Sequence, residues 1–259
     1  MKKLMNKRTG RAFLFALTLI PVAAIGGYFS VRLLLSSLDP SMLEDAISKA
    51  GSEEIVLAVS VIMTVVYATV LGFFGWIISE KIGLARPIQF QKKNLIPVLV
   101  ISMIGGVVFS LDAWTFGRWI PEVGSGYAAT GSFDIGTWVA SVLYGGVIEE
   151  VMMRLFCMGL FVLIGWKLFF RGKTEMEIPV GCFVFANILS ALLFAAGHLP
   201  ATIVSFGGLT PLLIFRCFLM NGAFGLIFGR IYRKHGIQYA MLAHMMFHLV
   251  SRTIWLIAF

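Results

Sequence analysis

Apolar positions along the chain form continuous runs and show no alternation between neighbouring residues. Runs of about 20 apolar residues are long enough to cross a bilayer as a helix. Only helices and closed barrels can satisfy their backbone hydrogen bonds in hydrocarbon, and continuous runs favour helices. The pattern therefore predicts an all-α fold, a polytopic transmembrane helical bundle, with spans near 12–35, 55–78, 94–112, 178–197, 210–229 and 237–257.

A further apolar region, 135–170, is too long for one upright span. At about 1.5 Å per residue it exceeds a hydrocarbon core of about 30 Å. It must tilt, overhang or break, and Gly145-Gly146 is the expected break. The chain then has seven spans, or eight if this region folds into two. We expect a single integral membrane domain over 1–259, with N-terminal spans in 1–134 and a motif-bearing catalytic core in 135–259.

Charge supports the membrane interpretation. Only 13% of the residues are charged, against about 25% in soluble domains. The net charge of +8 comes from short basic clusters between the apolar runs. Clusters in such positions set the orientation of membrane spans, and this distribution argues against nucleic-acid binding. The basic N-terminus precedes an apolar run longer than that of a signal peptide. We expect a retained first span, a cytoplasmic N-terminus and, without an organelle-targeting signal, a bacterial plasma membrane.

Two adjacent glutamates and an arginine interrupt the long apolar region in "GGVIEEVMMRLF". Ionisable residues inside spans are costly and usually face the bundle interior or a wet cavity. On a helix, Glu150 and Arg154 are i,i+4 neighbours and can form an ion pair, while Glu149 points about 100° away. A paired carboxylate stays ionised and structural, whereas an unpaired one suits general-base work. A purely structural ion-pair cluster is the alternative.

Three of the four histidines lie in or beside spans. His198 ends the stretch "FAAGH" together with Phe194, a position that also fits an ordinary interfacial residue. His244 and His248 in "HMMFH" are i,i+4 neighbours on one helical face. Such a pair can bind zinc or donate hydrogen bonds to a developing oxyanion.

Other polar or reactive residues carry weaker indications. Arg216 lies mid-span near Asn221 and needs an acidic partner, for which Glu149 and Glu150 are the candidates. The three cysteines, which have no metal-ligand spacing, fit packing roles better than that of a nucleophile: Cys157, Cys182 and Cys217.

The ordered motifs Glu-Glu-x-x-x-Arg, Phe-x-x-x-His and His-x-x-x-His resemble those of the type II CAAX prenyl endopeptidase and bacteriocin-processing family, also called CPBP or Abi. The resemblance covers about 145–252. It implies an intramembrane endopeptidase, without cofactor, that acts on a peptide or protein, either a prenylated protein or a leader peptide, among membrane lipids. Glu149 and His198 activate a water, His244 and His248 stabilise the oxyanion, and Glu150, Arg154 and Phe194 support the site.

The sequence departs from the family at His248, where Asn or Asp is more usual. A neutral histidine still offers one N–H donor. The change also makes Glu149, His198, His244 and His248 a conceivable set of zinc ligands, so a zinc-dependent protease remains an alternative.

Two non-proteolytic alternatives also remain. One is a membrane immunity or regulatory partner. The other is a small proton-coupled transporter, although no inverted repeat is visible.

The protease interpretation has a geometric difficulty, because a simple seven-span arrangement places His198 near the outer face and His244 nearer the cytoplasm. Adjustments are expected at Gly145-Gly146 and Pro200.

Overall fold

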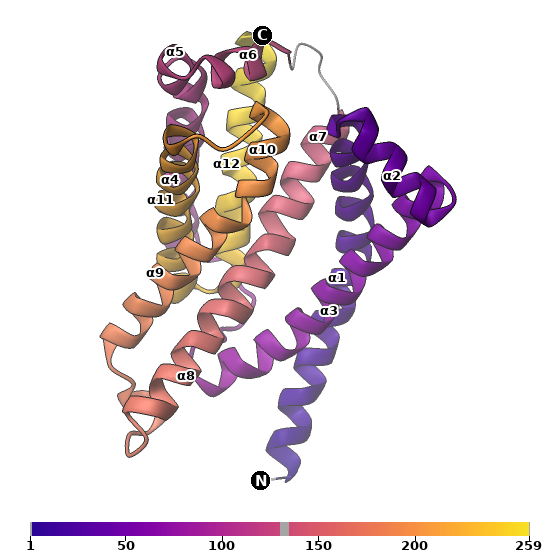
Figure 1. The fold of residues 1–259 in the computed structure, drawn as a ribbon. Coiled ribbons are helices and arrows are strands. Elements are labelled where there is room, and N and C mark those ends of the chain that lie inside the picture. The colour runs from indigo at the N-terminus through magenta and orange to yellow at the C-terminus, as the bar shows by residue number, and fades with distance from the viewer. Residues whose placement is uncertain (1, 130–134, 259) are drawn as a thin grey trace.

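The computed structural model describes residues 2–129 and 135–258, and this part of the chain is helical with short connections and no strand (Figure 1). The elements are α1 (Lys2–Ser37), α2 (Pro40–Ala50), α3 (Glu53–Lys81), α4 (Lys92–Ser110), η1 (Leu111–Ala113), α5 (Phe116–Trp119), α6 (Pro121–Ala129), α7 (Ile135–Val139), η2 (Ala140–Glu149), η3 (Val151–Met158), α8 (Gly159–Phe169), η4 (Glu175–Glu177), α9 (Val180–Gly197), α10 (Leu199–Phe206), α11 (Pro211–His235) and α12 (Ile237–Ala258).

Six segments in the described chain are long and apolar enough to cross a membrane, which confirms the predicted helical membrane bundle. They match the six shorter apolar runs expected from the sequence: Lys7–Ser37, Glu53–Lys81, Lys92–Trp119, Val180–Phe206, Pro211–His235 and Ile237–Ala258. Residues 229–236, "GRIYRKHG", fall between the expected spans 210–229 and 237–257, yet they do not form a separate loop. They form the last turns of α11, and Gly236, at φ 105°, makes the turn into α12.

The long apolar region forms one unbroken helical stretch from α7 through η2 and η3 to α8. Its middle is wound as a π-helix, a rare form that often occurs at functional sites. The break expected at Gly145-Gly146 is therefore wrong. The stretch instead runs obliquely through the bundle (Figure 1).

The two glycines serve close packing against α12. A Cβ built on Gly145 would lie 2.8 Å from His248 Nε2, and one on Gly146 would lie 3.0 Å from the Met245 backbone. Helices in a membrane gain contact mainly where small residues let them approach closely. Glycine here marks the place where η2 meets α12.

The expected span 178–197 is too short, because α10 follows α9 directly and extends the apolar segment to Phe206. His198 joins the two helices and lies well inside the segment, and Pro200 lies in the first turn of α10. The α8–α9 connection lies far below the α11–α12 turn, so α9 rises obliquely past that turn (Figure 1). This stagger removes the geometric difficulty, since His198 reaches the level of α12's histidines.

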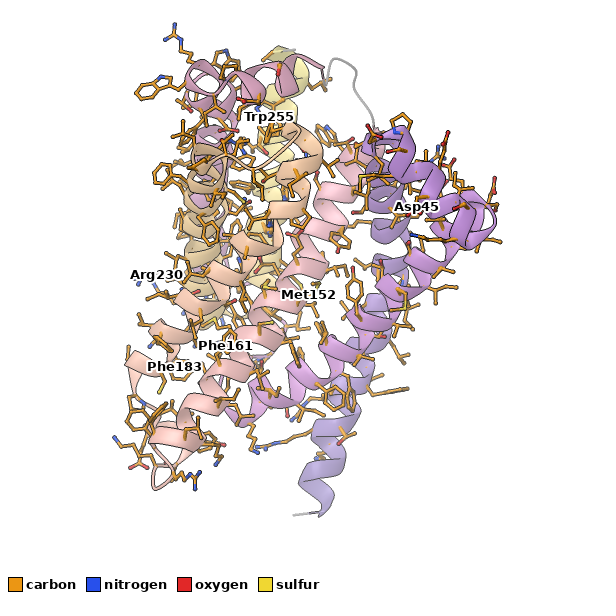
Figure 2. The ribbon with its side chains drawn as sticks, viewed as in Figure 1. Asp45, Met152, Phe161, Phe183, Arg230 and Trp255 are labelled. Atoms are coloured by element: carbon orange, nitrogen blue, oxygen red, sulfur yellow. The ribbon has the colours of Figure 1, made fainter. Side chains whose placement is uncertain are left out.

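The acidic segment around α2 and the basic connection between α8 and α9 lie at opposite ends of the molecule (Figure 1). Figure 2 shows Asp45, on α2, in the upper part and Phe183, near the start of α9, in the lower part. The N-terminus lies at the same end as the basic α8–α9 connection (Figure 1). This arrangement agrees with the alternation of sides that the charge pattern predicts.

Candidate active site

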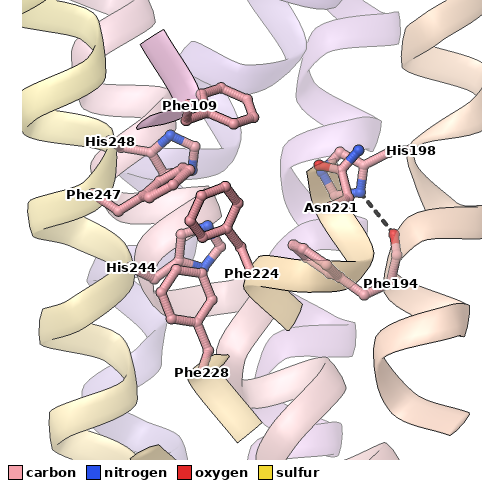
Figure 3. A pocket seen from close by; sticks show the side chains of 9 residues that line it. All are labelled: Phe109, Phe194, His198, Asn221, Phe224, Phe228, His244, Phe247 and His248. Atoms are coloured by element: carbon pink, nitrogen blue, oxygen red, sulfur yellow. Dashed lines mark hydrogen bonds between the residues drawn. The ribbon is translucent and has the colours of Figure 1, made fainter. Parts of the chain in front are cut away.

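A small cavity of about 30 Å³ lies between α4, α9, α11 and α12 (Figure 3). A cavity needs about 10–15 Å³ on this measure to hold a water, so this one has room for the reactant of a hydrolysis. Its lining is polar on two sides and aromatic elsewhere: His198, Asn221, His244 and His248, with Phe109, Phe194, Phe224, Phe228 and Phe247.

His198 enters the cavity from the junction of α9 and α10. Its Nδ1 lies 2.7 Å from the carbonyl oxygen of Phe194. A carbonyl can only accept, so Nδ1 carries the proton and donates. In the neutral form of this ring, the other nitrogen, Nε2, then has a free lone pair. This is the form of histidine that can take a proton from water.

His244 is held from behind by Glu150. Its Nδ1 lies 3.0 Å from Glu150 Oε1, and both side chains are buried. Its ring stacks on Phe228 at a centroid distance of 4.4 Å. A buried carboxylate and an aromatic face together fix the orientation of the imidazole. Glu150 does not line the cavity itself and contacts it through His244.

The ion pair expected between Glu150 and Arg154 is present. Glu150 Oε2 lies 3.3 Å from Arg154 Nε, and both side chains are 0% exposed. The guanidinium also lies over the ring of Phe194 at 4.6 Å, a cation–π contact. Phe194 in turn touches His198 and His244 at centroid distances of 4.5 and 5.9 Å. Glu150, Arg154 and Phe194 thus form a buried support behind both histidines.

His248 lies one turn beyond His244 on α12, and their rings stack at 4.7 Å. Its Nε2 occupies the space that a side chain at position 145 would fill. The η2 glycine thus decides where this imidazole can lie.

Of the four residues expected to act directly in the reaction, His198, His244 and His248 line the cavity and Glu149 does not. Its side chain is half-buried at the end of η2. Within the described part of the chain it makes no hydrogen bond or ion pair with another side chain, and Tyr144 is its electrostatic neighbour. The sequence prediction of one paired and one unpaired glutamate agrees with this arrangement, whereas a direct contact between Glu149 and His198 is not found.

The expected pairing of Arg216 with Glu149 or Glu150 is wrong. The Arg216 guanidinium binds the carboxylate of Asp112, which is 0% exposed and lies in η1, just after α4. Charge alone could not decide between acidic partners, because the choice depends on which helix faces α11. The signal for Asp112 was its place at the end of the third apolar run.

Sequence reasoning also gave Asn221 no role, although it lines the cavity from α11. Its Nδ2 donates to the backbone oxygen of Cys217 at 3.1 Å. A polar amide inside an apolar span was the available signal. None of the three cysteines lines the cavity in the described chain, as their predicted packing role requires.

No group of three or more His, Cys, Asp or Glu side chains within residues 2–129 and 135–258 is arranged to hold a metal ion. The four side chains considered as zinc ligands therefore do not form a ligand set in this arrangement, although three of them share the cavity.

Comparison with known families places the cavity in context. Residues 131–250 match the model of the family described as "Type II CAAX prenyl endopeptidase Rce1-like". This part of the chain is similar to the Rce1-like family. The match confirms the resemblance inferred from the three motifs and supports a CAAX-type intramembrane protease in general. The comparisons with curated proteins and with solved structures found no match.

The Rce1-like stretch contains each of the cavity's polar residues and both members of the Glu150–Arg154 pair. Asp112 lies outside it. The family match and the geometry therefore draw attention to the same part of the molecule.

Proposed function

We propose that this protein is an intramembrane endopeptidase that hydrolyses a peptide bond in a lipidated or hydrophobic peptide by means of a water activated by Glu149 and His198. One observation carries the proposal: histidines from two helices meet around a water-sized cavity inside an apolar bundle. A purely structural role would not require room for a water beside three imidazoles.

His198 is the group best placed to take the proton. The Phe194 carbonyl keeps its Nδ1 protonated, so its Nε2 can accept the proton of the water as the oxygen attacks the scissile carbonyl carbon. The same proton then passes to the leaving amine as the carbon–nitrogen bond breaks. Glu149, with no competing ion-pair partner, shares this acid–base work when the substrate brings the two groups together.

His244 and His248 stabilise the oxygen anion of the tetrahedral intermediate. Because His244 already donates from Nδ1 to Glu150, it donates to the oxyanion from Nε2 only as the doubly protonated ring. The Glu150 carboxylate compensates that charge, and Arg154 holds the carboxylate in place. His248 donates one N–H at the position where the family more often has Asn or Asp.

The membrane setting is part of the proposal. We place the protein in a bacterial plasma membrane as one integral domain. Its N-terminus is assigned to the cytoplasm, because the N-terminus and the basic α8–α9 connection lie at the same end of the molecule (Figure 1). A reporter fused to the N-terminus checks the orientation: protection from protease outside the cell is expected, and digestion would reverse the topology.

The test is cleavage of a panel of prenylated and leader peptides by the purified protein and by Glu149→Ala, each with and without a chelator. Cleavage that survives chelation and is lost in Glu149→Ala supports the glutamate–histidine mechanism. Cleavage that stops with chelator and returns with zinc assigns the site to a metal. If the folded protein cleaves no peptide of the panel, a non-enzymatic membrane partner is favoured.

A further inference from the structure

A second cavity, of about 250 Å³, lies at the end of the bundle where the connection between α3 and α4 passes the α11–α12 turn. Within the described chain no residue lines both this cavity and the histidine cavity. It has room for a group of several non-hydrogen atoms.

The rim of the second cavity is cationic. Arg86 and Lys234 are exposed there, beside the half-buried ring of His235. No acidic residue is among those that line it in the described part of the chain. Arg86 also donates to the backbone oxygen of Arg233, which ties the α3–α4 connection to the end of α11. The rim therefore favours an anion.

Gln238 also lines this cavity, and its side chain carries an acceptor without a partner in the described chain. Gln238 is only 7% exposed, and its Nε2 lies 3.2 Å from the carbonyl oxygens of both Pro87 and Gln89. Two carbonyl acceptors require the NH₂ group on that side, so the orientation of the amide is settled. Its Oε1 is buried and has no hydrogen-bond partner in the described chain. A buried acceptor without a partner calls for a donor from outside.

We propose that this cavity binds the headgroup of an anionic phospholipid whose alcohol carries a free hydroxyl. The phosphate lies between Arg86 and Lys234, and the hydroxyl donates to Gln238 Oε1. The ammonium of a zwitterionic headgroup would meet the same cations and be repelled. The ligand thus needs both a negative charge and an O–H donor.

Position favours a lipid over a soluble phosphate ester. The cavity opens beside the start of α4, the end of α11 and the start of α12. These helices are long enough to span a bilayer, and the ends of such helices lie near the headgroup layer. Basic pockets between membrane helices are known to hold anionic headgroups. Figure 1 shows α1, α8 and α9 reaching beyond the level of the α11–α12 turn, so other helices continue past the turn on the same side of the bundle.

The test measures binding of tail-labelled phosphatidylglycerol to the full-length protein in nanodiscs of phosphatidylcholine. Unlabelled phosphatidylglycerol, phosphatidylmethanol and sn-glycerol 3-phosphate serve as competitors. Phosphatidylmethanol has the same charge but lacks the hydroxyl, so it should compete several-fold less well. The double variant Arg86→Gln, Lys234→Gln should lose roughly tenfold or more in affinity.

The matched control is Arg171→Gln, Lys173→Gln, in the α8–α9 connection. Both residues are exposed, and Arg171 also donates to a backbone oxygen, that of Lys167. The control removes the same charge from the same end of the bundle and should keep the affinity of the unmodified protein. Lys234→Glu, a single exposed substitution, provides a second variant should the double variant fold poorly.

Three results would overturn the proposal. An equal loss in the control would mean that only general surface charge attracts the lipid. Equal competition by phosphatidylmethanol would remove the role of Gln238. Displacement by glycerol phosphate at similar concentrations would identify a soluble ligand.

Discussion

The bundle buries two arginine–carboxylate pairs that look alike but differ in what surrounds them. Arg154 with Glu150 and Arg216 with Asp112 are both buried, and each guanidinium lies over a phenylalanine ring, at 4.6 and 4.7 Å. Glu150, however, also contacts His244, whose ring lines a cavity. Neither Asp112 nor Arg216 lines that cavity within the described chain.

This difference shows that a buried charge alone does not identify an active site. Both pairs are expensive to place in an apolar bundle, and both hold helices together. Only the pair that touches a titratable ring beside a water-sized space can influence a reaction. In the proposed mechanism, the position of that ring, and not the cost of the charge, distinguishes the Glu150–Arg154 pair from the Arg216–Asp112 pair.

The largest expected effect separates the two pairs directly. Glu150→Gln and Asp112→Asn should each lower the free energy of unfolding by about 3–5 kcal/mol, because each leaves a buried arginine without its carboxylate. Only Glu150→Gln should also reduce cleavage per folded molecule, by about 10²-fold or more, since His244 loses its orienting partner.

Denaturation monitored by circular dichroism, with peptide cleavage normalised to the folded fraction, measures both quantities. A loss of normalised activity in Asp112→Asn as large as in Glu150→Gln would erase the distinction between the pairs.

A smaller effect is expected at the contact between η2 and α12. Gly145→Ala places a methyl group against His248 Nε2 and should reduce the cleavage rate by roughly 10–100-fold, because a displacement of a fraction of an ångström misplaces the donor. Gly222→Ala is the control: its Cβ would lie 3.9 Å from the Ala195 Cβ, an ordinary contact.

The control should keep its activity and gain up to about 1 kcal/mol of stability through better helix propensity. Steady-state cleavage by the two variants compares them, and unchanged activity in Gly145→Ala would mean that His248 has no role in the reaction.

The smallest effect concerns Asn221, which lines the cavity beside the histidines (Figure 3). Asn221→Ala should slow cleavage by about tenfold or less, because the amide lines the cavity but is neither the base nor an oxyanion donor in the proposed mechanism. Cleavage at saturating and at low peptide concentration distinguishes a change in kcat from one in KM. A loss larger than that of Glu150→Gln would make Asn221 a principal catalytic group and reorder the site.

Much of the fold followed from the hydrophobic pattern, because spans of about 20 apolar residues are set by bilayer thickness. The Glu150–Arg154 pair followed from helical spacing. The role of Gly145-Gly146 could not be predicted, because a glycine pair fits a helix break and a close helix contact equally well until the neighbouring helix is known. The partner of Arg216 was missed for a related reason, because charge does not specify which helices face one another.

The convergence of His198 with His244 also could not be derived from the sequence. It depends on α10 continuing α9 and on the stagger between α9 and the α11–α12 turn. The amino-acid composition indicates neither feature. The position of Glu149 outside the cavity lining is likewise a matter of side-chain direction on a π-wound helix, whereas the sequence argument assumed α-helical spacing.

The most direct test of the central claim, that the histidine cavity is the catalytic centre, is cleavage by His198→Ala beside Asn187→Ala. Asn187 is a polar residue of the same helix that does not line the cavity and donates to the Leu226 backbone. Loss of the base should slow cleavage by about 10²–10⁴-fold with the helix content intact, while Asn187→Ala keeps its rate. Full activity in folded His198→Ala would contradict the account and place the chemistry elsewhere in the molecule.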